Sequence, residues 1–257
     1  MKNCLILGVG RSGTSLMGGI LHQAGYYMGD SLYPPRHSNP KGFFECDFIN
    51  RINENILNSY DITQSRSYIF SEEKERSPLN PGYGQRWLSF IPANQSIHSN
   101  DNQIDINIRH AIEKKPFAYK DPRFNYTIHV WDQYLDNEAV YICMFREPGI
   151  TIQSILKECS GVEYLSNFFI DPYWAEHIWI NSYNHLLKNL TTLNRSILFV
   201  HYQQLIKGEI ILKISDLLHC KLNNDFISKE LNRTQNRTIV SSETLSIYDD
   251  LCKLADY

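Results

Sequence analysis

Four short segments of the chain are mainly apolar: Cys4–Leu7, 117–119, 139–145 and 196–200. Runs of this length and apolar content are typical of buried strands. The segments between them carry apolar residues at helical spacing, as at 16–21 and 48–57. This alternation predicts an α/β protein of three layers, in which helices cover both faces of a mainly parallel sheet.

The pattern is interrupted between the first two predicted strands, where residues 26–116 are too many for a simple crossover. Residues 66–102 are polar and rich in Ser, Asn, Pro and Gly. We therefore interpret residues from about 61 to 103 as a loop-rich insertion or lid on the ligand side of the sheet. The whole chain, 1–257, suits one domain, because 42% of its residues are hydrophobic and allow a sizeable core.

Charge and cysteine content exclude several classes of function. The chain has 25 Lys and Arg against 28 Asp and Glu, a net charge of −3, so it has no overall basic field for nucleic acid. Its six cysteines form no C-x-x-C pair, which indicates reduced thiols and no zinc site. No apolar run is long enough for a membrane span and no signal peptide precedes the first strand, so we expect a cytoplasmic protein.

A glycine-rich loop follows the first predicted strand. Gly8 and Gly13 fit the glycine frame of a Walker-type phosphate-binding loop, but Thr14 occupies the position of the lysine that contacts a triphosphate. Backbone N–H groups of the loop and of the helix start would hold a phosphate or similar anion. The sequence thus predicts a P-loop-type fold with an anion site formed by Gly10, Arg11, Ser12, Gly13, Thr14 and Ser15.

A second candidate phosphate site follows the third predicted strand. Arg146 leaves the strand, and Pro148 suits the first turn of a helix, which would place Ser154 about two turns along that helix. An arginine fork and a serine hydroxyl are both suitable donors to phosphate oxygens. Because the carboxyl ends of parallel strands meet at one edge, this pair should lie near the glycine loop and near Lys120.

These motifs resemble those of the sulfotransferase superfamily. The run from Gly10 to Ser15 is similar to the family loop that binds the 5′-phosphosulfate of 3′-phosphoadenosine 5′-phosphosulfate (PAPS). Arg146 and Ser154 are similar to the family's 3′-phosphate site, with the same offset of eight residues. The resemblance implies PAPS as donor, 3′-phosphoadenosine 5′-phosphate (PAP) as product and no metal ion.

The resemblance also suggests the residues that act on the transferred group. Lys120 begins a K-D-P run similar to that of tyrosylprotein sulfotransferases and many bacterial relatives, which implies that Lys120 and Arg11 stabilise the transition state. Glu45 lies in a stretch that resembles bacterial sulfotransferases and is our candidate base, with a raised pKa among aromatic residues. Asp30 and His37 are alternative candidates for the base.

Structural alternatives stand beside these roles. Helix-dipole stabilisation alone explains a glutamate such as Glu45 in the first turn of a helix. In the structural alternative for Lys120, Asp121 caps the next helix and the lysine is exposed to solvent without a catalytic role. In the alternative for Arg146, the arginine forms an ion pair on the surface and binds no phosphate. Near the C-terminus, Arg233 lies in a segment that resembles one closing over the nucleotide in bacterial members, and we add it to the cofactor-binding candidates.

The leading interpretation is metal-independent, in-line transfer of a sulfuryl group from PAPS to a hydroxyl of a carbohydrate, a small-molecule alcohol or a tyrosine. One alternative is a small-molecule kinase or NTPase that uses the same loop frame. Another is a nucleotide-binding module without activity, because glutamines replace the family's acidic pair after Tyr202. The sequence identifies neither the acceptor nor the oligomeric state.

Overall fold

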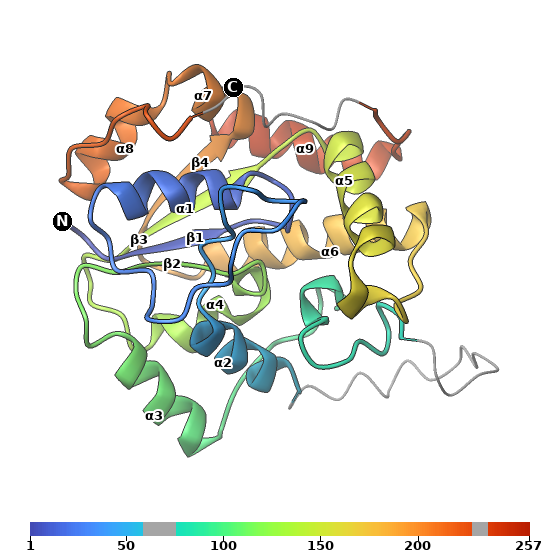
Figure 1. Cartoon of the computed structure of the whole chain (residues 1–257), viewed down its shortest axis with the longest axis horizontal. Coiled ribbons are helices and arrows are strands. Elements are labelled where there is room, and N and C mark those ends of the chain that lie inside the picture. The colour runs from blue at the N-terminus through green and yellow to red at the C-terminus, as the bar shows by residue number, and fades with distance from the viewer. Residues whose placement is uncertain (59–75, 228–235) are drawn as a thin grey trace.

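Four parallel strands form the centre of the computed structural model, which describes residues 1–58, 76–227 and 236–257 (Figure 1). The strand order is β2-β1-β3-β4. The strands are β1 (Cys4–Leu7), β2 (Ala118–Lys120), β3 (Val140–Phe145) and β4 (Ser196–His201). All four predicted strands are confirmed, with ends that differ by at most one residue.

Side chains of the strands alternate between the two faces of the sheet, as a period of two requires. In β1, Leu5 and Leu7 belong to one buried apolar cluster, whereas Cys4 and Ile6 belong to the other. Both faces are therefore buried, which explains why each strand reads as a continuous apolar run rather than as an alternation of polar and apolar residues.

Helices cover both faces of the sheet, so the predicted α/β class is confirmed (Figure 1). One face packs against α1 (Thr14–Gln23), α7 (Tyr202–Lys207) and α8 (Ile211–Leu218). The other face packs against a larger set, namely α2 (Asp47–Asn58), α3 (Asn102–Ala111), α4 (Phe124–Asp132), α5 (Pro148–Gly161), α6 (Pro172–Leu190) and α9 (Ser242–Leu254). None of the helices in the described ranges combines the length and apolar character needed to cross a membrane.

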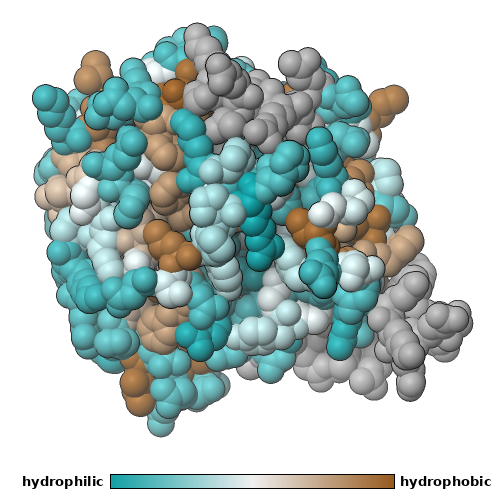
Figure 2. Space-filling model, viewed as in Figure 1, coloured by the Kyte–Doolittle hydropathy of each residue, from teal (hydrophilic) through white to brown (hydrophobic). Residues whose placement is uncertain are grey.

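The long segment between β1 and β2 contains α2, the 3₁₀ helix η2 (Arg86–Leu88) and α3. Leu88 and Ile91 are fully buried in the larger apolar cluster, so this part of the segment is anchored to the core. The predicted insertion at 61–103 falls partly on residues 59–75, which lie outside the described residues, and its extent stays a prediction. On the face shown in Figure 2, hydrophilic side chains predominate and apolar ones form small separate groups.

Hydrogen bonds from the helices beneath it support the glycine loop. The backbone N–H of Gly8 donates to Oδ1 of Asn125 on α4 over 2.8 Å, and Nδ2 of Asn125 donates to Oγ of Ser182 on α6 over 2.7 Å. All three partners are buried. Because a buried N–H group without an acceptor is costly, Asn125 determines where the chain leaves β1.

Asn125→Ala removes the acceptor of the Gly8 N–H in a site closed to water. We expect the free energy of unfolding to fall by about 1–3 kcal/mol, measured by urea denaturation. Gln103→Ala, an exposed position on α3, is the matched control and should change stability by less than about 0.5 kcal/mol. Equal losses in the two variants would show that the Gly8–Asn125 bond does not support the loop.

Candidate active site

Two adjoining pockets open where the strands end. The aromatic pocket has a volume of about 230 Å³ and is lined by the glycine loop, by Glu45 and Lys120, and by five aromatic side chains: Tyr33, Phe43, Tyr83, Trp87 and Tyr164. The loop pocket, of about 140 Å³, is lined by Gly13, Thr14, Arg146, Ser154 and Tyr202 among others. Arg11 and Ser15 line both pockets. The structure thus brings the predicted loop, Arg146, Ser154, Lys120 and Glu45 to one edge of the sheet.

In the part of the chain that the structure describes, no side chain caps the start of α1. Gly8, Arg11 and Gly13 have positive φ angles of 132°, 73° and 95°, which turn the loop around a common centre. Gly13 is the N-cap of α1 and supplies no side-chain acceptor, whereas Glu147 at the N-cap of α5 accepts from two backbone N–H groups. The first N–H groups of α1 therefore suit a phosphate or sulfonate oxygen.

Only glycine fits at the N-cap of α1. A Cβ atom at Gly13 would lie 2.5 Å from the ring of Tyr202, and the same ring lies under the guanidinium of Arg146, 4.6 Å from its Cζ. Tyr202 is the first residue of α7, directly after β4. The ring of Tyr202 therefore lies between the glycine loop and Arg146, the arginine that follows β3.

Arg146 and Ser154 face the loop pocket together. Pro148 is the first residue of α5, as the sequence predicts, and Ser154 lies on the same helix with its hydroxyl 3.1 Å from Nε of Arg11. Burial lowers the pKa of Arg146, with the charge of Arg11 acting in the same direction and Tyr202 against it. A poorly solvated guanidinium beside a second arginine is a strong attractor for a dianion.

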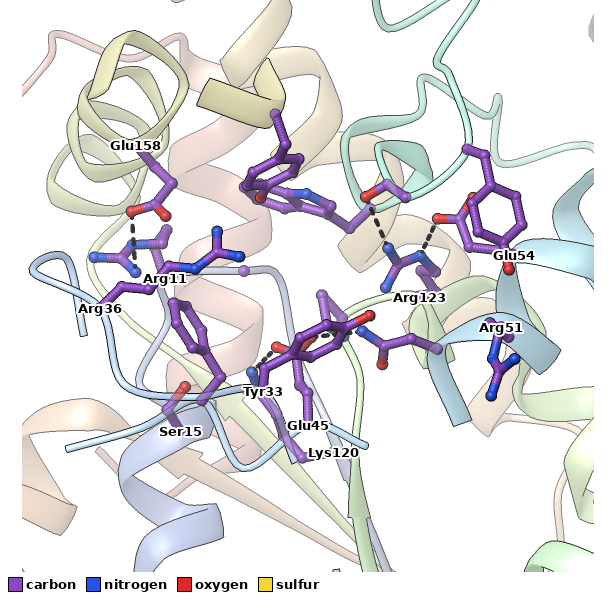
Figure 3. Close-up of a pocket in the computed structure, with 18 residues that line it drawn as sticks. Arg11, Ser15, Tyr33, Arg36, Glu45, Arg51, Glu54, Lys120, Arg123 and Glu158 are labelled. Carbon is purple, nitrogen blue, oxygen red and sulfur yellow. Dashed lines mark hydrogen bonds and ion pairs between the residues drawn. The ribbon is translucent and has the colours of Figure 1, made fainter. Parts of the chain in front are cut away.

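Lys120 and Glu45 form a buried ion pair at the base of the aromatic pocket (Figure 3). Lys120 is the last residue of β2, and Nζ donates to Oε1 of Glu45, while Oε2 accepts from Nδ2 of Asn50 over 3.0 Å. The side chain of Lys120 is 4% exposed and that of Glu45 13%. Two of the residues predicted for chemistry are thus in direct contact, although 75 positions separate them in the chain.

Two expectations about Glu45 are corrected. Glu45 precedes α2, which begins at Asp47, so it does not lie in the first turn of the helix. Its pKa is lowered and not raised. Burial by itself would raise the pKa of this carboxyl, but the charge and hydrogen bond of Lys120 outweigh it, with Asn50 and Arg123 adding to the effect. The carboxyl is therefore ionised at neutral pH.

Glu158 is a residue of the pocket that the motifs missed. Its carboxylate lies 3.5 Å from Nη1 of Arg11 and accepts from Oγ of Ser38 over 3.1 Å, and the same arginine donates to the carbonyl of Ser38 over 3.2 Å. The signal was in the sequence, because Glu158 follows Ser154 by one helical turn and so shares its face. The closed triangle holds the Arg11 side chain at the junction of the two pockets.

Other predicted site residues lie elsewhere. Ser12 is fully buried, its hydroxyl accepts from the Tyr183 hydroxyl over 3.1 Å and its backbone N–H donates to the carbonyl of Val9, so Ser12 faces the interior and lines neither pocket. Asp30 is exposed and paired with Lys114, and His37 is exposed, and neither lines the aromatic pocket or the loop pocket. Arg233 lies outside the described residues. Within the described ranges, no group of three His, Cys, Asp or Glu side chains is arranged to hold a metal ion.

A parallel α/β sheet whose first strand leads through a glycine-rich loop into a helix is typical of P-loop-like folds. The sulfotransferase family model matches residues 4–210, and the chain therefore belongs to the sulfotransferase family. The resemblance read from the sequence is confirmed at this level. No curated protein sequence matches the chain.

Three solved structures similar to this one are two sulfotransferases and one sulfotransferase domain. The sulfotransferase domain from the curacin biosynthetic pathway has 18% identity and a TM-score of 0.49, with 97% of each chain covered. Sulfotransferase STF9 from Mycobacterium avium has 13% identity and a TM-score of 0.47, with 98% of this chain and 74% of that chain covered. Sulfotransferase STF1 from Mycobacterium tuberculosis H37Rv has 12% identity and a TM-score of 0.48, covering 99% and 76%.

The lowered pKa of Glu45 predicts a pH-dependent contribution to stability. An ionised carboxylate with a pKa below its ordinary 4.5 stabilises the fold above that pH, and this contribution is lost as the pH falls through the folded-state value. Glu45→Gln should therefore lower the free energy of unfolding more at about pH 7 than at about pH 3, measured by urea denaturation.

Glu138→Gln is the control for this measurement, because the Glu138 side chain, paired with Lys2, is 75% exposed and its loss should have little effect at either pH. A loss for Glu45→Gln that is the same at both pH values would contradict the lowered pKa.

Proposed function

We propose that this sulfotransferase transfers a sulfuryl group from PAPS to a hydroxyl of an acceptor bound in the aromatic pocket. One observation carries the proposal: Arg11 and Ser15 line both pockets, so they stand where a donor in the loop pocket would meet an acceptor in the aromatic pocket. The chain acts as a single domain, with the described part of the insertion forming the wall of the acceptor side through Tyr83 and Trp87.

The residues of the loop pocket suit a nucleotide with two separate phosphate positions. The open start of α1 and the residues Gly10 to Ser15 would hold the 5′-phosphosulfate, and Arg146 with Ser154 the 3′-phosphate. Arg233 is retained as a further contact to the nucleotide. Thr14 in place of a lysine agrees with a donor that has no γ-phosphate.

PAPS supplies a sulfuryl group on an anionic leaving group, so the protein has to remove the acceptor proton and stabilise spread negative charge. Glu45 is the base in this proposal, because it is the carboxylate of the aromatic pocket that lies against Lys120. Lys120 and Arg11, which both line the aromatic pocket, provide the positive charge.

The ion pair also provides a way to strengthen the base when it is needed. While Lys120 contacts Glu45, the carboxylate pKa stays low and the carboxylate is a weak base. When Lys120 turns its charge toward an anionic group in the pocket, its lowering effect on the Glu45 pKa weakens, and burial, the largest single influence, shifts that pKa upward. The proton of the acceptor hydroxyl then passes to Oε1 of Glu45 with a better match of pKa.

The nucleotide site predicts binding of PAP. Isothermal titration should detect PAP binding to the wild type, weakened roughly 10- to 100-fold by Arg146→Ala and roughly 5-fold by Ser154→Ala, because a charged donor contributes more than a neutral one. Arg109→Ala, a change of an exposed arginine outside both pockets, is the matched control and should leave PAP affinity unchanged.

Thermal melting provides the comparison with a kinase. PAP should raise the melting temperature, and ATP with magnesium should not. The proposed donor would be contradicted if ATP with magnesium raised the melting temperature and PAP did not. It would also be contradicted if Arg146→Ala left PAP binding intact.

The role of Glu45 predicts a loss of turnover without a loss of nucleotide binding. With labelled PAPS and a library of hydroxyl acceptors, Glu45→Gln should reduce kcat by about 100- to 10,000-fold, the usual contribution of a general base. Its affinity for PAP should stay near that of the wild type. Asp30→Asn is the control, because Asp30 is exposed and lies outside both pockets. Full activity in Glu45→Gln would assign the base elsewhere.

A further inference from the structure

Five cationic side chains line the aromatic pocket, and four of them are paired with a carboxylate. Figure 3 shows three of the pairs: Arg11 with Glu158, Lys120 with Glu45, and Arg123 with Glu54. Arg51, at the rim, pairs with Asp47 over 3.0 Å. The fifth, Arg36, has no carboxylate within 4.0 Å among the described residues.

Two aromatic rings lie beside the Arg36 guanidinium, and a backbone turn defines where the side chain starts. Its Cζ lies 5.9 Å from the ring centre of Phe43 and 5.5 Å from that of Tyr164, both within range of a cation–π contact. The backbone N–H groups of Arg36 and Asn39 donate to each other's carbonyls over 3.2 and 2.9 Å. Figure 3 shows the Arg36 side chain reaching into the cavity. Arg36 is an exposed residue, and a guanidinium that two rings orient and no carboxylate of the described ranges neutralises can bind an oxyanion.

The position of Arg36 connects it with the acceptor rather than with the nucleotide. It lines the aromatic pocket and not the loop pocket, where Arg146 and Ser154 lie. Arg11 stands between the two pockets and is already held by Glu158 and Ser154. An anionic group bound to Arg36 would therefore be part of the acceptor in the aromatic pocket and not of the nucleotide.

We propose that the acceptor is an alcohol that also carries an oxyanion, a carboxylate or a phosphate ester, which binds Arg36 while its hydroxyl faces Glu45. This inference rests on the proposed function and adds the chemical class of the acceptor. The half-exposed rings of Tyr83 and Tyr164, 61% and 41% exposed, provide an apolar surface for the part of the acceptor between the two groups.

The test measures binding of matched acceptor probes to the PAP-saturated enzyme by isothermal titration. One pair is 4-hydroxyphenylacetate and 4-hydroxyphenylacetamide, which differ in charge and little in shape. A second pair, 6-hydroxyhexanoate and 6-hydroxyhexanamide, lacks the ring, and 4-(hydroxymethyl)phenyl phosphate represents the phosphate esters. In at least one pair, the anionic member should bind at least about 10-fold more tightly than its neutral amide, or the phosphate ester should bind at least about 10-fold more tightly than both amides. A charge-assisted contact provides a gain of this size.

Arg36→Gln should bring this ratio near one and leave PAP affinity unchanged. Arg109→Gln is the matched control, because Arg109 also stacks on a tyrosine ring, 4.9 Å from the centre of Tyr134, and lines neither pocket. Its ratio should equal that of the wild type. In turnover with labelled PAPS, Arg36→Gln should raise the KM for the anionic acceptor and leave kcat at saturation near the wild-type value.

The inference is overturned if the neutral members bind as tightly as the anionic ones, if Arg36→Gln keeps the preference, or if no anionic probe binds the PAP complex. In each of these cases PAP still binds, so the proposed donor stands. A protein that binds no PAP contradicts the proposed function, and this inference fails with it.

Discussion

All four strands of the described sheet run in the same direction, and the site depends on this constraint. Each strand end brings one component to the same edge: the glycine loop after β1, Lys120 at the end of β2, Arg146 after β3 and Tyr202 after β4. The polar residues of the site are therefore held by strands whose side chains are buried on both faces. Positions fixed in this way need little reorganisation when ligands arrive.

Charge balance is the second principle of the site. Removing Lys120 and Glu45 from water is costly for each, and their contact offsets much of that cost. The same holds for Arg11 with Glu158. A ligand with negative charge competes with these carboxylates for the cations. The affinity for such a ligand is then the difference between the contacts that the cations make with the ligand and those that they make with the carboxylates. Without a ligand, the carboxylates balance the charge of the cations, which allows the protein to stay folded around a highly charged cavity.

Local signals in the sequence predicted the fold and much of the site. Apolar runs gave the strands within one residue, and Pro148 placed Ser154 on the correct helix. Properties that depend on distant partners were not predictable. The pKa of Glu45 is governed by Lys120, 75 positions away, and the inward direction of the Ser12 hydroxyl accompanies its contact with Tyr183, 171 positions away. No window of sequence contains both members of such pairs.

The backbone of Arg11 shows how stability and function coincide at one residue. Its φ of 73° is a conformation in which a side chain costs about 1–2 kcal/mol relative to glycine. Glycine would relieve this strain, but it would leave the carboxylate of Glu158, 5% exposed, without its cation. An unpaired buried charge costs about 3–5 kcal/mol, which is more than the strain. Selection for heat resistance alone would therefore retain the strained arginine, and with it the guanidinium that lines both pockets.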